Sequence, residues 1–226
     1  MNGKLIVLEG LDGSGKTTQF EKIDKLLYAK SIDHKAISFP DYDQPSSELV
    51  RMYLAGEILQ DPKAVNAFAA SSFYAVDRYV SFKKFWEEDY NNGKLIFAAR
   101  YVTSNMIYQM VKLPEEEWRS YIEWLSDYEY DKLGLPKPDL VIFMDMPVDI
   151  SQQLLSKRYT GTDRKKDIHE ANVSFLHDCR KAAFFAAKEL GWKIVSCAED
   201  GRARRVDSIT TQLLDIIDNA LVEEVL

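Results

Sequence analysis

Cysteine is scarce in this sequence, and long apolar runs are absent from it. The two cysteines, Cys179 and Cys197, lack the spacing of metal ligands, which argues against a zinc site or a disulfide scaffold and fits a reducing compartment. No apolar run approaches the roughly 20 residues of a membrane span, and no secretory signal pattern precedes the first strand-like segment. We therefore expect no membrane partner and a cytoplasmic location.

An excess of positive charge is also lacking. The 29 basic residues are outnumbered by 36 acidic ones, and the net charge is −7. Because a chain this acidic has no broad electrostatic footprint for nucleic acid, we expect no polynucleotide partner, and any bound phosphate must be held by locally concentrated Arg and Lys. With 46% hydrophobic and 29% charged residues, the composition is that of an ordinary globular protein. The length favours one domain over residues 1–226.

A glycine-rich segment, GLDGSGKT at residues 10–17, follows an apolar run at residues 5–8 and precedes a segment with helical spacing. A glycine, four residues and then Gly-Lys-Thr, between a strand and a helix, is the pattern of a phosphate-binding loop. Its backbone N–H groups can surround a phosphate, Lys16 can reach the β- and γ-phosphates, and the Thr17 hydroxyl can bind Mg²⁺. The residues predicted to bind ATP are Gly10, Asp12, Gly13, Ser14, Gly15, Lys16, Thr17 and Thr18.

Short apolar runs alternate with segments of helical periodicity along the whole chain. The strands are expected at residues 5–8, 35–39, 94–98, 140–144 and 192–195. Helices are expected after them, among others at residues 62–91, 104–110, 148–156, 169–190 and 206–221. This alternation predicts an α/β fold, a doubly wound, five-stranded parallel sheet with helices on both faces. A polar, basic segment at residues 157–166 is predicted to be a loop between two helices.

Several short motifs follow the phosphate-binding loop in a specific order. They are Phe39-Pro40-Asp41-Tyr42, Asp77-Arg78, Arg100-Tyr101, Ser104-Asn105, Pro138-Asp139-Leu140 and the basic segment near Arg164. Over nearly its whole length the chain resembles the thymidylate kinases, P-loop enzymes that transfer the γ-phosphoryl group of ATP to dTMP. The resemblance implies ATP and Mg²⁺ as cofactors, dTMP as the acceptor, and a homodimer.

The resemblance also implies roles in binding the nucleoside part of dTMP. Asp12 would contact the sugar 3′-hydroxyl, Tyr74 would stack on thymine, Arg78 would contact the polar edge of the base, Asn105 would hydrogen-bond the base, and Tyr108 would pack under the deoxyribose. Taken alone, the helical pattern instead favours a core aromatic for Tyr74 and a solvated ion pair for Arg78. With the resemblance taken into account, we expect Tyr74 and Arg78 to bind the thymine base.

Arginines are expected to bind the phosphate of dTMP and to assist the transfer of the γ-phosphoryl group. By the same resemblance, Arg51 and Arg100 would hold the dTMP phosphate, since a guanidinium suits phosphate geometry, and the substrate site would include Phe39 and Tyr42. Because the phosphate-binding loop contains no arginine, a lid at about residues 157–168 would supply a catalytic one. The candidates are Arg158 and Arg164, and the alternative is a solvated basic loop. The predicted catalytic residues are Lys16, Arg100, Arg158 and Arg164.

One position departs from the family pattern. Ala99 stands where the family has an aspartate before Arg100. The loss of that carboxylate should weaken Mg²⁺ positioning without abolishing phosphate binding. Asp145, at the end of the fourth strand, is an alternative acid, although the family places that strand on the other side of the first. Two further readings stay open, namely a kinase for another nucleoside monophosphate or a deoxynucleoside, and a catalytically impaired nucleotide-binding protein.

Overall fold

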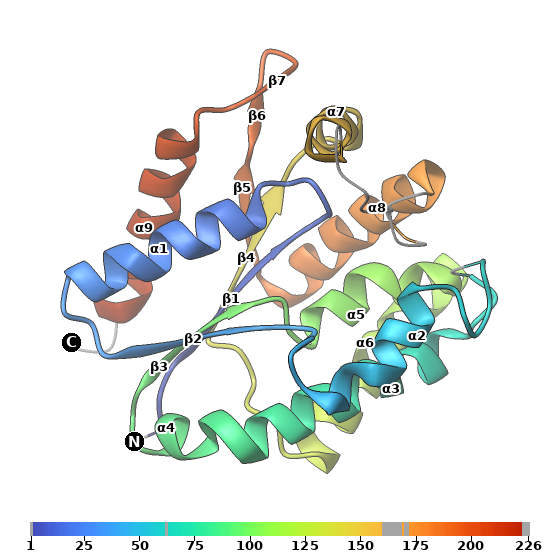
Figure 1. Cartoon of the computed structure of the whole chain (residues 1–226), viewed down its shortest axis with the longest axis horizontal. Coiled ribbons are helices and arrows are strands. Elements are labelled where there is room, and N and C mark those ends of the chain that lie inside the picture. Colours follow the sequence, from blue (N-terminus) through green and yellow to red (C-terminus); the bar gives the residue numbers. More distant parts are fainter. Residues whose placement is uncertain (1, 62, 160–168, 170–171, 223–226) are drawn as a thin grey trace.

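The computed structural model describes residues 2–61, 63–159, 169 and 172–222, with the side chains of 157–159 left out. Its centre is a parallel sheet of five strands in the order β2-β3-β1-β4-β5 (Figure 1). The strands are β1 Leu5–Gly10, β2 His34–Ser38, β3 Leu95–Ala99, β4 Leu140–Asp145 and β5 Lys193–Ser196. The predicted fold class is confirmed, and β4 lies on the opposite side of β1 from β3.

The three central strands are buried at every position, because helices cover both faces of the sheet. Alternate residues of β1 enter two different cores, with Leu5 and Val7 in one and Ile6 and Leu8 in the other. α1 (Lys16–Ala29) and α9 (Val206–Val222) close the face of Ile6 and Leu8, as Figure 1 shows.

The remaining helices pack on the other face or on one another, and they carry most of the predicted acceptor-site residues. They are α2 Glu48–Leu54, α3 Ala67–Ser81, α4 Glu87–Asn91, α5 Thr103–Tyr108, α6 Trp118–Ser126, α7 Val148–Tyr159 and α8 Val173–Leu190, with short 3₁₀ turns at Pro45–Ser47, Met110–Lys112 and Glu115–Glu117. Two π-helical segments, η2 (Phe82–Trp86) and η5 (Asp127–Lys132), continue α3 and α6. In the described part of the chain no helix is long and apolar enough to cross a membrane.

Several predicted boundaries are wrong, and capping residues explain two of them. The helix expected from residue 62 begins at Ala67, where the Asn66 side chain accepts a hydrogen bond from the Ala69 amide (2.8 Å). The helix expected from residue 169 begins at Val173, capped in the same way by Asn172. α7 runs three residues past its expected end, to Tyr159. A small hairpin of β6 (Ala198–Glu199) and β7 (Arg202–Ala203) was not predicted.

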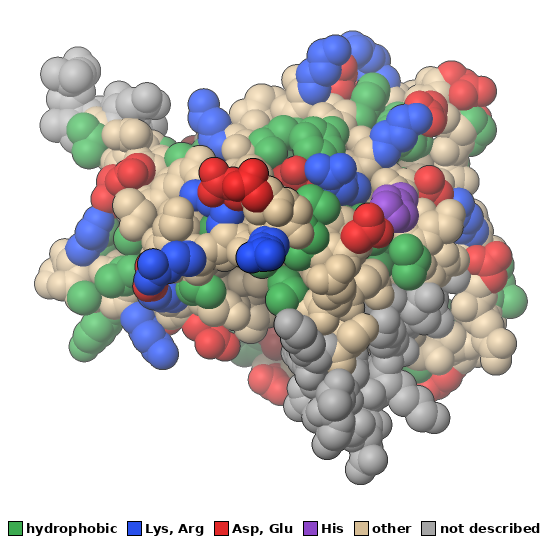
Figure 2. All heavy atoms as spheres, turned by 90° about the horizontal axis from the view of Figure 1, so that it is seen from above, with side chains coloured by type: hydrophobic (Ala, Val, Ile, Leu, Met, Phe, Trp, Pro, Cys, Tyr) green, Lys and Arg blue, Asp and Glu red, His purple; other side chains and the backbone are tan. Residues whose placement is uncertain are grey.

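Figure 2 shows the face of the molecule that is uppermost in Figure 1. Basic and acidic side chains are interspersed on it rather than segregated. A face of this kind offers no extended positive surface to a nucleic-acid backbone. Both cysteines, Cys179 and Cys197, are buried and unbridged.

Candidate active site

The phosphate-binding loop connects β1 to α1 and depends on its glycines. Gly13 and Gly15 have φ angles of 78° and 84°, left-handed values that residues with a side chain rarely adopt. A Cβ atom on Gly13 would also lie 2.7 Å from the carbonyl oxygen of Ser151 in α7. The chain therefore turns tightly into α1, whose first amides have no helical acceptor and are a site for an anion.

The Ser14 hydroxyl supports a phosphate ligand in this loop. Its Oγ is buried and has no hydrogen-bond partner among the residues that the structure describes. A buried polar atom without a partner is costly unless a ligand satisfies it, and a phosphate oxygen can accept a hydrogen bond from the Ser14 hydroxyl. The loop opens into a cavity of about 520 Å³ that extends to Leu155 of α7, to Ala203 in β7 of the hairpin and to the adjacent Arg204. The residues present fit a nucleoside triphosphate.

A second cavity, of about 280 Å³, lies on the other side of the loop. It shares Asp12, Lys16 and Thr17 with the first, so the two cavities meet at these three residues. The predicted acceptor residues that line it are Phe39, Tyr42, Tyr74, Arg78, Arg100, Asn105 and Tyr108. A larger cavity of about 700 Å³ lies around Asp139 and Trp192 and contains none of the predicted site residues.

Asp12, Arg100 and Tyr108 form one cluster where the cavities meet. Arg100 Nη2 pairs with Asp12 Oδ1, the Tyr108 hydroxyl donates to Asp12 Oδ2 (3.1 Å), and the Arg100 guanidinium lies 5.1 Å from the centre of the Tyr108 ring. Burial alone would raise the pKa of Asp12, but Arg100 and Lys16 outweigh it and lower that pKa. Burial raises the pKa of Tyr108 well above its ordinary value, so its hydroxyl remains a donor.

The backbone of Arg100 is unusual. Its φ is 65°, a left-handed value that costs a non-glycine residue of the order of 1–3 kcal/mol. Arg100 directly follows β3, and its amide still bonds to the carbonyl of Leu8 in β1 (3.1 Å). The left-handed turn thus redirects the side chain toward the phosphate-binding loop at the carboxyl end of the sheet, where ligands bind in open α/β folds.

A buried ion pair lies at the far end of the acceptor cavity. Arg78 and Glu129 are 1% and 0% exposed, and Nε and Nη2 of Arg78 donate to the two carboxylate oxygens at 2.7 and 2.6 Å. Arg78 thus lines the cavity and is also paired, but the pair is buried and not solvated as the helical pattern alone suggested. Sequence reasoning missed Glu129. Its signal is an acid that follows the buried Ile122 and Leu125 at core spacing.

His169 is a second residue that sequence reasoning missed. It is 4% exposed and stacks on Tyr108, with ring centres 5.3 Å apart, and its Nε2 lies 3.0 Å from the Tyr53 hydroxyl. Burial lowers the pKa of His169 to about 3, so the ring is neutral near pH 7. Tyr53 also accepts from Lys112 (2.9 Å), whose pKa burial lowers to about 7. The ring of Tyr108 thus contacts both Arg100 and His169.

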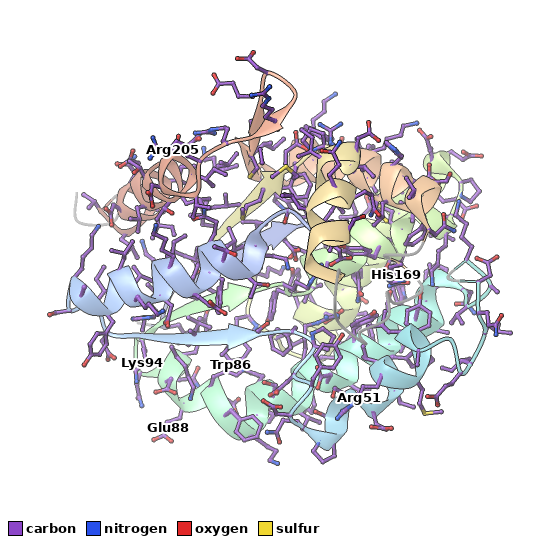
Figure 3. All side chains as sticks on the ribbon, turned by 45° about the horizontal axis from the view of Figure 1, so that its top comes forward. Arg51, Trp86, Glu88, Lys94, His169 and Arg205 are labelled. Atoms are coloured by element: carbon purple, nitrogen blue, oxygen red, sulfur yellow. The ribbon has the colours of Figure 1, made fainter. Side chains whose placement is uncertain are left out.

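Some predicted site residues are not brought to the cavity. Arg51, labelled in Figure 3, does not line it, and its guanidinium instead donates to the carbonyl of Tyr42 (2.9 Å) and the hydroxyl of Ser47 (3.0 Å). Asp77 likewise holds the Asp41 amide (2.9 Å). These contacts fix the loop that carries Tyr42. The predicted lid falls almost wholly outside the described residues, as do Arg164 and the side chain of Arg158.

The acids near the phosphate-binding loop are already engaged. Glu9 is fully buried and accepts from the Thr103 hydroxyl (2.7 Å), the Ser104 hydroxyl (2.9 Å) and the Tyr101 amide (3.2 Å). Asp145, the alternative acid, is held by Arg180 at 2.7 and 2.8 Å.

These contacts limit how a metal could be held. In the described parts of the chain no three His, Cys, Asp or Glu residues are grouped as metal ligands. Thr17, which lines both cavities, fits a Mg²⁺ ion that is held mainly by substrate phosphates and water.

Comparison with known proteins gives a consistent result. A family model described as thymidylate kinase matches residues 8–207. A probable thymidylate kinase of Pyrococcus horikoshii is 30% identical over 183 residues, which cover 81% of this chain and 84% of that protein. A thymidylate kinase of Mycobacterium tuberculosis is 25% identical over 190 residues, covering 83% and 87%. In fold, the chain is similar to a thymidylate kinase structure from Candida albicans, with a TM-score of 0.67, 24% identity, and coverage of 96% and 92%.

Proposed function

This chain belongs to the thymidylate kinase family, and from that premise we propose that it transfers the γ-phosphoryl group of ATP to dTMP, giving ADP and dTDP. One observation carries the proposal. The cavity at the phosphate-binding loop and the cavity lined by the acceptor residues meet at Asp12, Lys16 and Thr17. Two nucleotides bound in these cavities would bring their phosphates together at one lysine.

Positioning and charge compensation would do most of the catalytic work. Phosphoryl transfer places negative charge on the transferred group, and the protein has little covalent chemistry to perform. We assign Lys16 to that charge and Arg100 to the phosphate of the acceptor, which Arg100 would hold by exchanging its contact with Asp12. Mg²⁺, with Thr17 as a protein ligand, would neutralise the ATP phosphates. Arg158 and Arg164 remain proposed sources of a lid arginine.

The acceptor cavity has the features that a deoxyribonucleotide needs. Tyr74 would stack on the base, and Arg78 and Asn105 would hydrogen-bond its polar edge. Tyr108, held by its contacts with Arg100 and His169, would pack against the deoxyribose and exclude a 2′-hydroxyl. Asp12, with its lowered pKa, is an ionised acceptor for the 3′-hydroxyl.

We also propose a homodimer. Four apolar side chains on the outer surface of α3 and η2 are between 37% and 44% exposed. They are Phe68, Val76, Tyr79 and Phe85. Exposed apolar residues gathered on one stretch of helix are typical of a protein–protein interface.

The proposal is tested by measuring ADP release with ATP and a panel of acceptors. dTMP should give the highest kcat/KM, above dCMP, CMP, AMP and thymidine. Highest activity with another acceptor would support the alternative of a different nucleotide or nucleoside kinase. Tight calorimetric binding of ATP and dTMP without ADP release would support an impaired nucleotide-binding protein, for which Ala99 is the motivating observation.

A further inference from the structure

Glu129 lies behind the acceptor cavity rather than in it. Its carboxylate is completely buried in η5, and it does not line the cavity, whereas its partners Arg78 and Asn105 do. Its hydrogen bonds to Arg78 and Asn105 therefore connect Glu129 to a nucleotide bound in the cavity.

Glu129 determines which edge of Arg78 is available. Because Nε and Nη2 both donate to the carboxylate, the guanidinium is held side-on. Among the residues that the structure describes, the remaining nitrogen, Nη1, has a long 3.4 Å contact to the carbonyl of Tyr101 as its one hydrogen bond. Arg78 can thus offer a hydrogen-bond donor to the cavity through Nη1. Its two hydrogen bonds to Glu129 restrict the orientation of the guanidinium.

Glu129 also determines how the amide of Asn105 is turned. Asn105 Nδ2 lies 3.3 Å from Glu129 Oε1 and 3.5 Å from the carbonyl oxygen of Ser71. Both neighbours can only accept a hydrogen bond, so the NH₂ group must face them. The amide oxygen, Oδ1, is then turned the other way, and Asn105 presents an acceptor to the cavity.

A donor beside an acceptor is a pattern that distinguishes pyrimidines. Thymine offers an acceptor at O4 and a donor at N3–H, which complement Arg78 Nη1 and Asn105 Oδ1, whereas cytosine offers a donor at N4 and an acceptor at N3. We infer that Glu129 is a positioning residue that sets the selectivity of the acceptor site for a 4-keto over a 4-amino pyrimidine. This inference rests on the proposed function, because it assumes a pyrimidine nucleotide in this cavity.

The first test variant is Glu129→Gln. Glutamine keeps the shape and one carbonyl acceptor, but it cannot accept from both Arg78 nitrogens and Asn105 together. The KM for dTMP should rise about tenfold. The ratio of kcat/KM for dTMP to kcat/KM for dCMP should fall by about tenfold or more, which is the effect expected from the loss of one hydrogen bond. The kcat for saturating dTMP and the KM for ATP should stay within about twofold. Glu123→Gln, the same change at an exposed position of α6, is the control and should leave all four constants unchanged.

Glu129→Asp is the second variant, which keeps the buried charge opposite Arg78 if the glutamine variant does not fold. Its shorter side chain loses the contact with Asn105, so its preference for dTMP should also fall. A lower melting temperature with an unchanged dTMP to dCMP ratio in these variants would show that Glu129 is only structural and would overturn the inference, while the proposed function stood. A wild-type protein that phosphorylates dTMP and dCMP equally would also overturn it. A wild-type protein inactive with dTMP would overturn both proposals, and the wild-type assay alone reveals that case.

Discussion

Restoring a carboxylate at position 99 should raise the rate of phosphoryl transfer when Mg²⁺ is limiting. Side chains alternate along β3, and Leu95 and Phe97 enter the core on the α1 side of the sheet, so Ala99 points to that side. Ala99 pairs with Leu8 in β1, shortly before the loop that leads into α1. An aspartate there would extend toward the first turn of α1, which holds Thr17.

The magnitude follows from what the carboxylate would do. A group that orients a metal-bound water or the Thr17 hydroxyl is typically worth 10–100-fold in metal affinity or activity, so Ala99→Asp should raise kcat by about that factor. Ala99 is only 6% exposed, and a buried carboxylate is costly without a partner. The amino terminus of α1 and Lys16 offset part of that cost, and a bound Mg²⁺ would offset more. The variant should therefore gain more thermal stability from Mg²⁺ than the wild type does.

The assay is a Mg²⁺ titration of the initial rate for the wild type, Ala99→Asp and the uncharged control Ala99→Asn. Only the aspartate variant should gain activity, mostly at low Mg²⁺, and calorimetry should give the same Kd for dTMP in all three. Equal rates for the wild type and Ala99→Asp at every Mg²⁺ concentration would refute this reasoning. Another group would then already orient the metal.

Three further predictions concern side chains around the two cavities. Tyr108→Ala should phosphorylate ribothymidine monophosphate, because the tyrosine ring no longer fills the space beside C2′, whereas Tyr108→Phe should keep the preference for dTMP. Steady-state kinetics with both acceptors test this prediction, and an unchanged preference for dTMP in the alanine variant would contradict it. His169 becomes protonated near pH 6.5 in the unfolded state but only near pH 3 in the folded state, so the unfolded state binds more protons between these pH values. The free energy of unfolding should therefore fall as the pH falls from about 6.5 to about 3. Denaturant titrations should show a shallower pH dependence for His169→Phe, and parallel curves would rule out the buried neutral ring. For the lid, Arg158→Ala or Arg164→Ala should lower kcat at least about tenfold with little change in KM, because arginine fingers are worth roughly 10³–10⁵ in other phosphoryl-transfer enzymes; if neither does, the catalytic arginine lies elsewhere.

Features that local sequence determines were predictable. The phosphate-binding loop depends on glycines at left-handed positions within one short segment. Each of the five strands corresponds to a short apolar run, and the three central runs are buried at every position. The starts of α3 and α8 were predicted too early, because the N-caps Asn66 and Asn172 begin these helices later than apolar periodicity suggests.

Site residues were predictable only where a single continuous segment of the sequence determines where they lie. Both Arg51 and Arg100 were predicted to hold the phosphate, and the sequence favours Arg100 because it follows a strand. In the structure, contacts with the loop around Tyr42 occupy Arg51, while a left-handed turn directs Arg100 to the phosphate-binding loop. Glu129 and His169 act on residues 51 and 61 positions away, Arg78 and Tyr108 respectively, and no local pattern records such pairings. Their roles emerge only when the helices pack.

The central claim is that one phosphoryl group passes from ATP to dTMP where the two cavities meet. Incubating the protein with ATP labelled at the γ-phosphorus and with dTMP tests this directly. The account predicts that the label appears in dTDP, in step with ADP formation and only when dTMP is present. Label that accumulates as inorganic phosphate, or that stays in ATP while both nucleotides are bound, would contradict it.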